Sequence, residues 1–148
     1  MTAGPDQLEG FTPYVMNRIM ARYNKGVEEA LKDVGITVAQ MRALAVLTEN
    51  GPCTINTLSV LTVIKQPTLS RTLDTMEAAG LIRREADAKD SRIRHIQLTE
   101  TGKRVHETAW PAMLRMQDVM FSVLSADDRK MMNDLLLRVF YSIRQHDF

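Results

Sequence analysis

Cysteine, net charge and long apolar runs are all scarce in this sequence of 148 residues. Its single cysteine, Cys53, excludes a disulfide within the chain and is typical of a reducing compartment. No apolar run is long enough to span a bilayer, and Met1 to Gly10 lacks the apolar stretch of a signal peptide. We therefore expect a cytoplasmic protein of one domain that does not contact membranes.

The formal net charge is only +1, which excludes a strongly basic protein. Contact with nucleic acid would therefore depend on a local cluster of cations rather than on overall charge. Residues 83–94 contain a modest excess of this kind. The cations there are Arg83, Arg84, Lys89, Arg92 and Arg94, set against Glu85, Asp87 and Asp90.

Sequence motifs of the common enzyme classes are missing as well. The chain has no Gly-x-Gly-x-x-Gly, no Gly-Lys-Ser/Thr loop and no Gly-x-Ser-x-Gly elbow. His95, His106 and His146 are far apart, and none has a second histidine or a cysteine at the spacing of metal ligands. We therefore expect no enzymatic activity, no cofactor and no metal site.

Residues that begin and end helices are easy to find in the chain. Helices are predicted over about residues 13–31, 37–48, 67–79, 99–123 and 125–144, with one more short helix after residue 54. Thr37 and Gln40 have the spacing of a capping box. The predicted N-caps are Thr12, Thr37, Thr54, Thr99 and Ser125.

Two short strands are predicted after Gly80, over residues 81–85 and 93–98. The loop from Ala86 to Ser91 is longer than a tight two-residue turn, so it should project. A helix with a polar face, followed at once by a hairpin that carries an arginine, is the layout of a winged helix-turn-helix. We therefore predict a mainly α (α+β) fold, with a winged helix-turn-helix between terminal helices.

The helix predicted over residues 67–79 would place Leu69, Leu73 and Met76 on one apolar face. Its other face and its N-terminus could read base edges in the major groove and contact phosphates. Arg71 is the first candidate for a base contact. The alternative is the solvated polar face of an ordinary surface helix. The predicted contact residues are Lys65, Gln66, Pro67, Thr68, Ser70 and Arg71.

The hairpin loop offers a second set of DNA contacts. Arg92 suits the narrow, electronegative minor groove. Asp90 can accept hydrogen bonds from the backbone or from the guanidinium, which would hold the loop and aim Arg92. Lys89 and Arg94 complete the predicted set. The alternative is a charged hairpin tip with an ordinary surface ion pair.

Taken together, these motifs resemble the MarR family of bacterial and archaeal transcription factors from about residue 11 to residue 144. The matching segments are Ile36-Thr37-x-x-Gln40, Gly51-Pro52, Gln66-Pro67-Thr68-Leu69-Ser70-Arg71, Gly80-Leu81-Ile82, Arg84, Asp90-Ser91-Arg92 and Leu98-Thr99-x-x-Gly102.

The resemblance implies one domain over residues 1–148. Residues 36–99 would form the DNA-binding module, and residues 11–31 and 100–146 would form dimerisation helices. It also implies a homodimer on double-stranded DNA with a palindromic operator, where a small ligand or an oxidant relieves repression.

The expected last helix supports a dimer independently of the resemblance. Its apolar stripe is too wide for a surface helix that packs on one side only. The alternative is a core within one chain, in which the preceding long helix covers part of the stripe. The stripe consists of Met131, Met132, Leu135, Leu136, Val139, Phe140 and Ile143.

A small effector is a further expectation. Tyr14, Arg18 and Arg22 fall on one face of the first long helix, where a ligand carboxylate could meet a cation. Trp110 and Met113 could border an apolar pocket on the helix that follows the wing. We therefore hypothesise an anionic aromatic effector. The alternatives are arginines in surface or dimer contacts and methionines in an ordinary core.

Two other functions stay open. Cys53 could sense oxidants, although a partly buried structural thiol is the simpler interpretation of its place after Gly51-Pro52. The winged helix could also bind only proteins, with Arg71 and Arg92 as surface charges.

Overall fold

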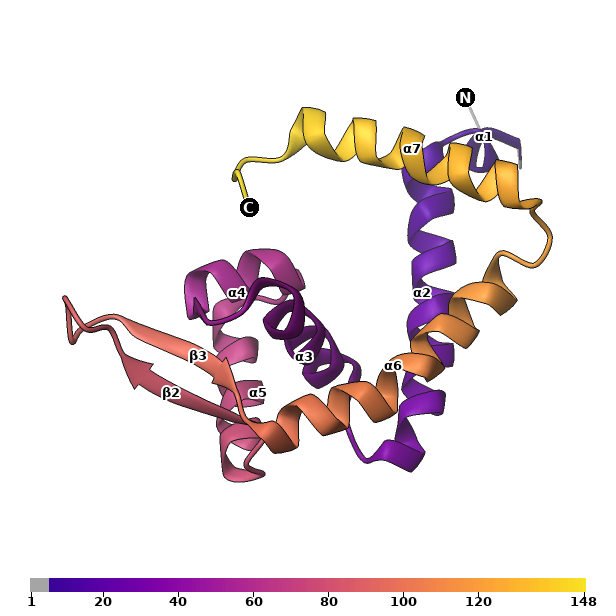
Figure 1. The fold of residues 1–148 in the computed structure, drawn as a ribbon. Coiled ribbons are helices and arrows are strands. Elements are labelled where there is room, and N and C mark those ends of the chain that lie inside the picture. The colour runs from indigo at the N-terminus through magenta and orange to yellow at the C-terminus, as the bar shows by residue number, and fades with distance from the viewer. Residues whose placement is uncertain (1–5) are drawn as a thin grey trace.

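The chain is mainly helical with one small sheet, as the sequence predicts (Figure 1). The computed structural model describes residues 6–148. Residues 1–5, part of the segment in which we expect no signal peptide, lie outside the described residues. The helices are α1 (Asp6–Glu9), α2 (Thr12–Leu31), the 3-10 turn η1 (Lys32–Val34), α3 (Val38–Asn50), α4 (Ile55–Thr62), α5 (Gln66–Ala78), α6 (Glu100–Met120) and α7 (Ala126–Ile143). The strands are β1 (Cys53–Thr54), β2 (Ile82–Ala86) and β3 (Arg94–Leu98).

Capping side chains begin four of these helices. Thr37 and Gln40 form the predicted capping box, in which the Thr37 Oγ1 accepts from the Gln40 amide at 3.1 Å and the Gln40 Oε1 accepts from the Thr37 amide at 3.0 Å. The side-chain oxygens of Thr54, Thr99 and Ser125 also accept from amides three residues later. These four predicted N-caps are confirmed.

The prediction that Thr12 caps the first long helix is wrong. The N-cap of α2 is Phe11, which makes no side-chain cap, and its carbonyl accepts from the amides of Tyr14 at 2.9 Å and Val15 at 3.3 Å. Thr12 is therefore already helical, and Pro13 stands at the second helical position. A proline is tolerated there because the first amides of a helix have no partner within it.

Three short elements were missed by the sequence prediction. They are α1, η1 and the strand β1, which has only two residues. Such a strand shows no alternation of apolar and polar residues, and it exists because it pairs with β3, Cys53 opposite Ile96 and Thr54 opposite His95. The other helices and strands were predicted, with ends that differ by a few residues.

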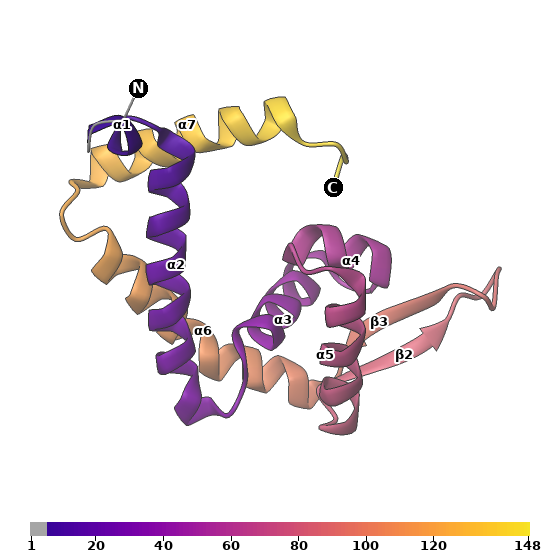
Figure 2. The ribbon, with the colours of Figure 1, turned by 180° about the vertical axis from the view of Figure 1, so that it is seen from behind.

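The sheet is antiparallel in the order β1-β3-β2. β2 and β3 pair from Ile82 opposite Leu98 to Ala86 opposite Arg94. The hairpin loop between them projects away from the rest of the chain in both ribbon views (Figures 1 and 2). The projecting loop was predicted from its length.

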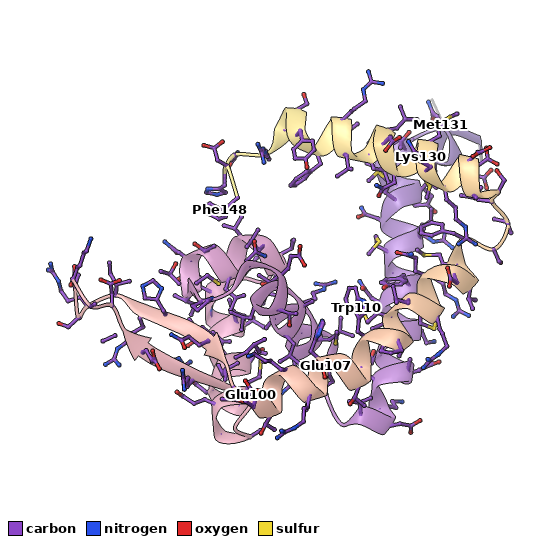
Figure 3. The ribbon with its side chains drawn as sticks, viewed as in Figure 1. Glu100, Glu107, Trp110, Lys130, Met131 and Phe148 are labelled. Carbon is purple, nitrogen blue, oxygen red and sulfur yellow. The ribbon has the colours of Figure 1, made fainter. Side chains whose placement is uncertain are left out.

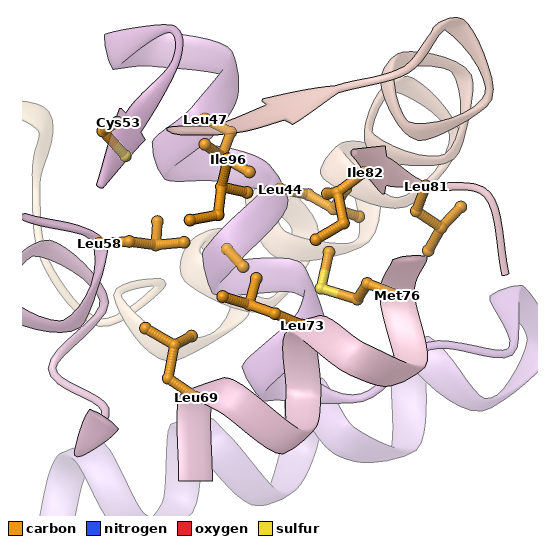
Figure 4. Packing of buried hydrophobic residues seen from close by; sticks show 11 residues of the cluster. Leu44, Leu47, Cys53, Leu58, Leu69, Leu73, Met76, Leu81, Ile82 and Ile96 are labelled. Atoms are coloured by element: carbon orange, nitrogen blue, oxygen red, sulfur yellow. The ribbon is translucent and has the colours of Figure 1, made fainter. Parts of the chain in front are cut away.

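A single apolar cluster holds the winged module together (Figure 4). Leu69, Leu73 and Met76 bury the inner face of α5 against Leu44 of α3 and Ile96 of β3, and all five side chains are at most 2% exposed. This confirms the apolar face that helical spacing predicts for α5. A second cluster joins α2, α3 and α6 through Val27, Leu31, Met41 and Ala109.

The start of α6 lies directly against the start of the wing, the hairpin that β2 and β3 form with the loop between them. The Thr99 amide donates to the Leu81 carbonyl at 3.1 Å, and the Thr99 hydroxyl donates to the Gly80 carbonyl at 2.5 Å. At Gly102 a Cβ would fall 2.1 Å from the Leu81 carbonyl oxygen, so only glycine fits there. This close approach fixes the wing to the helix that leads out of the module.

The two ends of the chain form a separate layer of helices. α2 and α6 cross beside the winged module, and α7 then turns back across the end of α2 (Figures 1 and 2). Of the residues in α7, none is buried within the described chain. α6 therefore does not bury the apolar stripe of α7. Among residues 6–148, no helix combines the length and the apolar character needed to cross a membrane.

Candidate nucleic-acid interface

The turn between α4 and α5 sets the direction of α5. Val63 takes a left-handed conformation with φ of 57°, and the Ser59 hydroxyl donates to the Ile64 carbonyl at 2.6 Å. Lys65 is then the N-cap of α5, in an extended conformation, and Pro67 stands within the first two helical positions. Gln66 and Thr68 in the first turn are exposed, so an anion can reach the free amides of this N-terminus.

Most of the predicted contact residues of α5 are exposed. Burial of Leu69, Leu73 and Met76 turns the opposite side of the helix to solvent. The exposed residues there are Lys65, Gln66, Pro67, Thr68 and Arg71, and Ser70 is half-buried. The sequence therefore located the polar face of this helix correctly.

Asn56 is a polar residue of this surface that the sequence analysis missed. It lies exposed in the first turn of α4, and its Oδ1 accepts a hydrogen bond from the side-chain Nε2 of Gln66. Its position two residues after the predicted cap Thr54 was the available signal. The contact adds a side chain from a second helix to the predicted set at the start of α5.

Arg84 joins β2 to α5. Its Nη2 lies 2.8 Å from Asp74 Oδ1 and its Nη1 lies 2.5 Å from Glu77 Oε2, while its backbone amide donates to Glu77 Oε1 at 3.3 Å. The side chain is only 23% exposed. Arg84 therefore fixes the angle between helix and wing, and its charge is neutralised rather than offered to a ligand.

The wing also carries exposed cations. Arg92 is 90% exposed, and Asp90 Oδ1 accepts from its backbone amide at 3.0 Å and from its Nε at 3.1 Å. This confirms the prediction that Asp90 holds the arginine by hydrogen bonds. The same bonds lower the pKa of Asp90, the side-chain bond from Arg92 most of all. Lys89 and Arg94 are also exposed.

Helix and wing meet around one hollow of about 540 Å³. Ser70 of α5 lines it from one side and Arg92 and Arg94 from the other, with Asn56 of α4 beside them. Arg71 and Lys89 do not line this hollow. Side chains from α4, α5 and the wing thus form one concave, cationic surface.

The residues predicted for an effector lie in three different places. Arg18 and Arg22 line a hollow of about 790 Å³ together with Met116 and Met120 of α6. The Tyr14 hydroxyl accepts from Arg18 Nη1 at 2.8 Å. Trp110 lies on the other side of α6, and Met113 packs against the buried cluster around Val27 and Leu31.

Trp110 borders a separate hollow of about 480 Å³ beside α3 (Figure 3). Its ring stacks on His106, with the ring centroids 5.4 Å apart. Partial burial lowers the pKa of His106, and Glu107 opposes this shift. Among residues 6–148, no three histidine, cysteine, aspartate or glutamate side chains come together in a way that could hold a metal.

Cys53 packs within the core of the winged module (Figure 4). It is 9% exposed, and burial raises the pKa of its thiol. The thiolate is the form that reacts with oxidants, and a raised pKa keeps it scarce at neutral pH. The structure favours the interpretation of Cys53 as a structural thiol.

Comparisons with known proteins agree on one family. The profile of the MarR family matches residues 34–93. The HTH-type transcriptional repressor IacR of Pseudomonas putida is 26% identical over 135 residues, which cover 91% of this chain and 81% of that protein. An HTH-type transcriptional regulator of Bacillus cereus is 32% identical over 123 residues, covering 82% of each chain.

A solved structure extends this similarity to the whole chain. A MarR family transcriptional regulator from Silicibacter pomeroyi matches with a TM-score of 0.85 and 39% identity, over 95% of each chain. The similarity therefore includes the terminal helices as well as the winged module.

The burial of Cys53 leads to a testable expectation. At neutral pH a thiol-reactive dye should label the native protein at least about ten times more slowly than the unfolded protein, and the rate should rise toward alkaline pH. Stopped-flow absorbance measures both rates, with Cys53→Ser as the unlabelled control. Equal rates in the native and unfolded protein would restore the oxidant-sensing hypothesis.

Proposed function

The chain belongs to the MarR family of DNA-binding transcriptional regulators, and on that premise we propose that it is a homodimeric repressor of an inverted-repeat operator, released by a small effector. The family consists of transcriptional regulators, which are not enzymes. In the proposed division of the chain, residues 36–99 bind DNA, while residues 11–31 and 100–146 form the dimer. The repressor role is supported by the Pseudomonas relative, which is itself a transcriptional repressor.

The observation that carries DNA binding is the joint surface of α5 and the wing. α5 presents an exposed N-terminus, and Arg92 stands 90% exposed across the hollow that Ser70 also lines. A helix of this kind fits the major groove, while a hairpin beside it reaches the adjacent minor groove. Arg84 holds these two elements at a fixed angle, as simultaneous contact with both grooves requires.

We assign different roles to the residues of this surface. Arg71 and Gln66 carry the donors that read base edges, and Lys65, Thr68 and Ser70 contact phosphates beside the helix N-terminus. Pro67 fixes the first turn that presents these groups. In the wing, Arg92 enters the minor groove, with Lys89 and Arg94 on the flanking phosphates and Asp90 holding the arginine.

Substitution of the two arginines should separate base reading from groove binding. Arg71→Ala should cost about 1 to 3 kcal/mol and relax the preference at one base position. Arg92→Ala should weaken binding with little change at major-groove positions. Fluorescence anisotropy with a duplex selected from a random pool measures both effects, and Arg115→Ala on α6 serves as the matched control.

The salt dependence of the same binding tests the protein-only alternative. The log-log slope should be steep, about −0.9 for each phosphate contacted. A flat slope, or unchanged affinity in both arginine variants, would show that the assigned surface does not bind DNA.

The exposed face of α7 supports the homodimer. Val139 is 57% exposed, Phe140 49% and Ile143 71%, although all three are apolar and lie on one helix. An exposed apolar surface of this extent marks a protein interface. A second copy, related by two-fold symmetry, would cover the stripe and place the two recognition helices about 34 Å apart, one turn of DNA.

A charge introduced into this stripe should break the dimer. Val139→Asp should give monomers in analytical ultracentrifugation, because the new carboxylate would be buried without a partner. Asn133→Asp adds the same charge at a polar position of α7 and should leave the dimer intact. Full inverted-repeat DNA should bind more tightly than one half-site. Equal affinity for both, or a monomeric native protein, would overturn the homodimer.

We place the carboxylate of an anionic aromatic effector at Arg18 and Arg22. Both guanidinium groups line the same hollow, the Tyr14 hydroxyl holds Arg18, and the apolar side chains of Met116 and Met120 face them. Trp110 borders the hollow beside α3 and Met113 packs against a buried cluster, so both lie outside this hollow. A ligand between α2 and α6 can shift the helices that set the spacing of the two winged modules.

A panel of benzoate, salicylate and indole carboxylates tests this site. At least one acid should raise the melting temperature of the wild-type protein and release operator DNA, and Arg18→Ala with Arg22→Ala should abolish the shift. Arg115→Ala is the control. If Trp110→Ala alone abolishes the shift, the ligand lies beside α3 instead, and if no acid acts, the effector is of another class.

A further inference from the structure

The tip of the wing is closed by its own backbone. The Asp87 amide donates to the Ile93 carbonyl at 2.9 Å, and the Ile93 amide donates to the Asp90 carbonyl at 3.0 Å. These bonds bring both ends of the loop together. They do not by themselves fix the direction of Arg92, whose side chain is almost fully exposed.

Two carboxylates in series fix the residues within this loop. Asp87 Oδ1 accepts from the amides of Lys89 at 2.8 Å and Asp90 at 3.0 Å. Asp90 Oδ1 in turn accepts from the amide and the Nε of Arg92. The position of Asp87 therefore determines the position of Asp90, and Asp90 determines that of Arg92.

Asp87 is itself held by a residue of the sheet. His95 Nε2 lies 3.0 Å from Asp87 Oδ2, the oxygen that the tip amides leave free. His95 belongs to β3, where its backbone is paired on both sides, with Glu85 of β2 and Thr54 of β1. Both side chains are about one-third exposed, 32% for His95 and 31% for Asp87. The imidazole thus connects the rigid sheet to the loop.

We propose that His95 is a positioning residue for Arg92 in DNA binding, acting through Asp87 and Asp90. This inference rests on the proposed function, in which Arg92 enters the minor groove. A wing whose arginine is already aimed loses less conformational entropy on binding DNA. We call the series of contacts from His95 through Asp87 and Asp90 to Arg92 the relay. Since it depends on side chains, it can be weakened without unfolding the sheet.

Two charged groups face His95. They are Asp87 in the tip and Glu85 opposite on β2, and Glu85 is also paired with Arg83 at 2.9 Å. The partner on β1, Thr54, is uncharged. Bonds from the amides of Lys89 and Asp90, and then from His95, lower the pKa of Asp87, which keeps it ionised at neutral pH.

Two substitutions at position 95 test the hydrogen bond to Asp87. His95→Gln keeps a donor near the position of Nε2, and His95→Leu removes the donor. We expect His95→Leu to weaken binding of the selected duplex about fivefold. His95→Gln should bind the duplex about as tightly as the wild type, and so should His106→Gln on α6.

Hydrogen exchange gives a readout that needs no DNA. The amides of Lys89 and Asp90 should exchange faster in His95→Leu than in the wild type, while the amides of β2 and β3 stay protected. If these tip amides are equally protected in both proteins, the relay does not hold the loop. The role of the hydrogen bond is wrong if His95→Gln binds the duplex as weakly as His95→Leu.

The Arg92→Ala variant distinguishes this inference from the proposed function. If Arg92→Ala binds DNA as tightly as the wild type, the minor-groove role of Arg92 fails. If Arg92→Ala binds weakly but His95→Leu binds normally, only the relay fails. The relay also predicts that His95→Leu has no further effect in the Arg92→Ala background, and an additive loss there would overturn it.

Discussion

Burial of Leu69, Leu73 and Met76 is the interaction on which the rest of the structure depends. These side chains attach one face of α5 to the sheet and to α3, and so decide which face remains in solvent. The exposed N-terminus of α5, the hollow beside it and the place of the wing all follow from this packing. A cavity at one of these positions would disturb the proposed DNA-binding surface without touching any residue on it.

Polar contacts then fix what apolar packing leaves free. Hydrophobic contact is not directional, so the core alone would allow the hairpin to tilt against α5. Arg84 removes that freedom through Asp74 and Glu77, and Thr99 ties the base of the wing to α6. Among the cations of residues 83–94, Arg84 therefore holds the module together, whereas Arg92 stays exposed.

The terminal helices leave an apolar surface exposed in the single chain. α7 exposes its apolar stripe, and α2 and α6 form a hollow lined by arginines and methionines at the same end. In the proposed dimer, the helices that join two copies are also the helices that would hold an effector. Movement of α6 would reach the wing through Thr99 and Gly102, where helix and hairpin are in direct contact.

Local sequence determined the helices, their N-caps, the hairpin and the polar face of α5, because these features depend on spacing and on side chains a few residues apart. Thr12 was wrongly predicted as an N-cap because the N-cap is the residue whose carbonyl accepts the first hydrogen bond of the helix. The strand β1 was missed because two residues cannot show an alternating pattern. Only tertiary structure decided that Arg84 forms ion pairs within the module and that Asn56 joins the polar surface of α5. Tertiary structure also placed Arg18 and Trp110 in different hollows and brought His95 within hydrogen-bond distance of Asp87. Those outcomes depend on distances between elements, and such distances are set by how whole faces pack rather than by any local pattern.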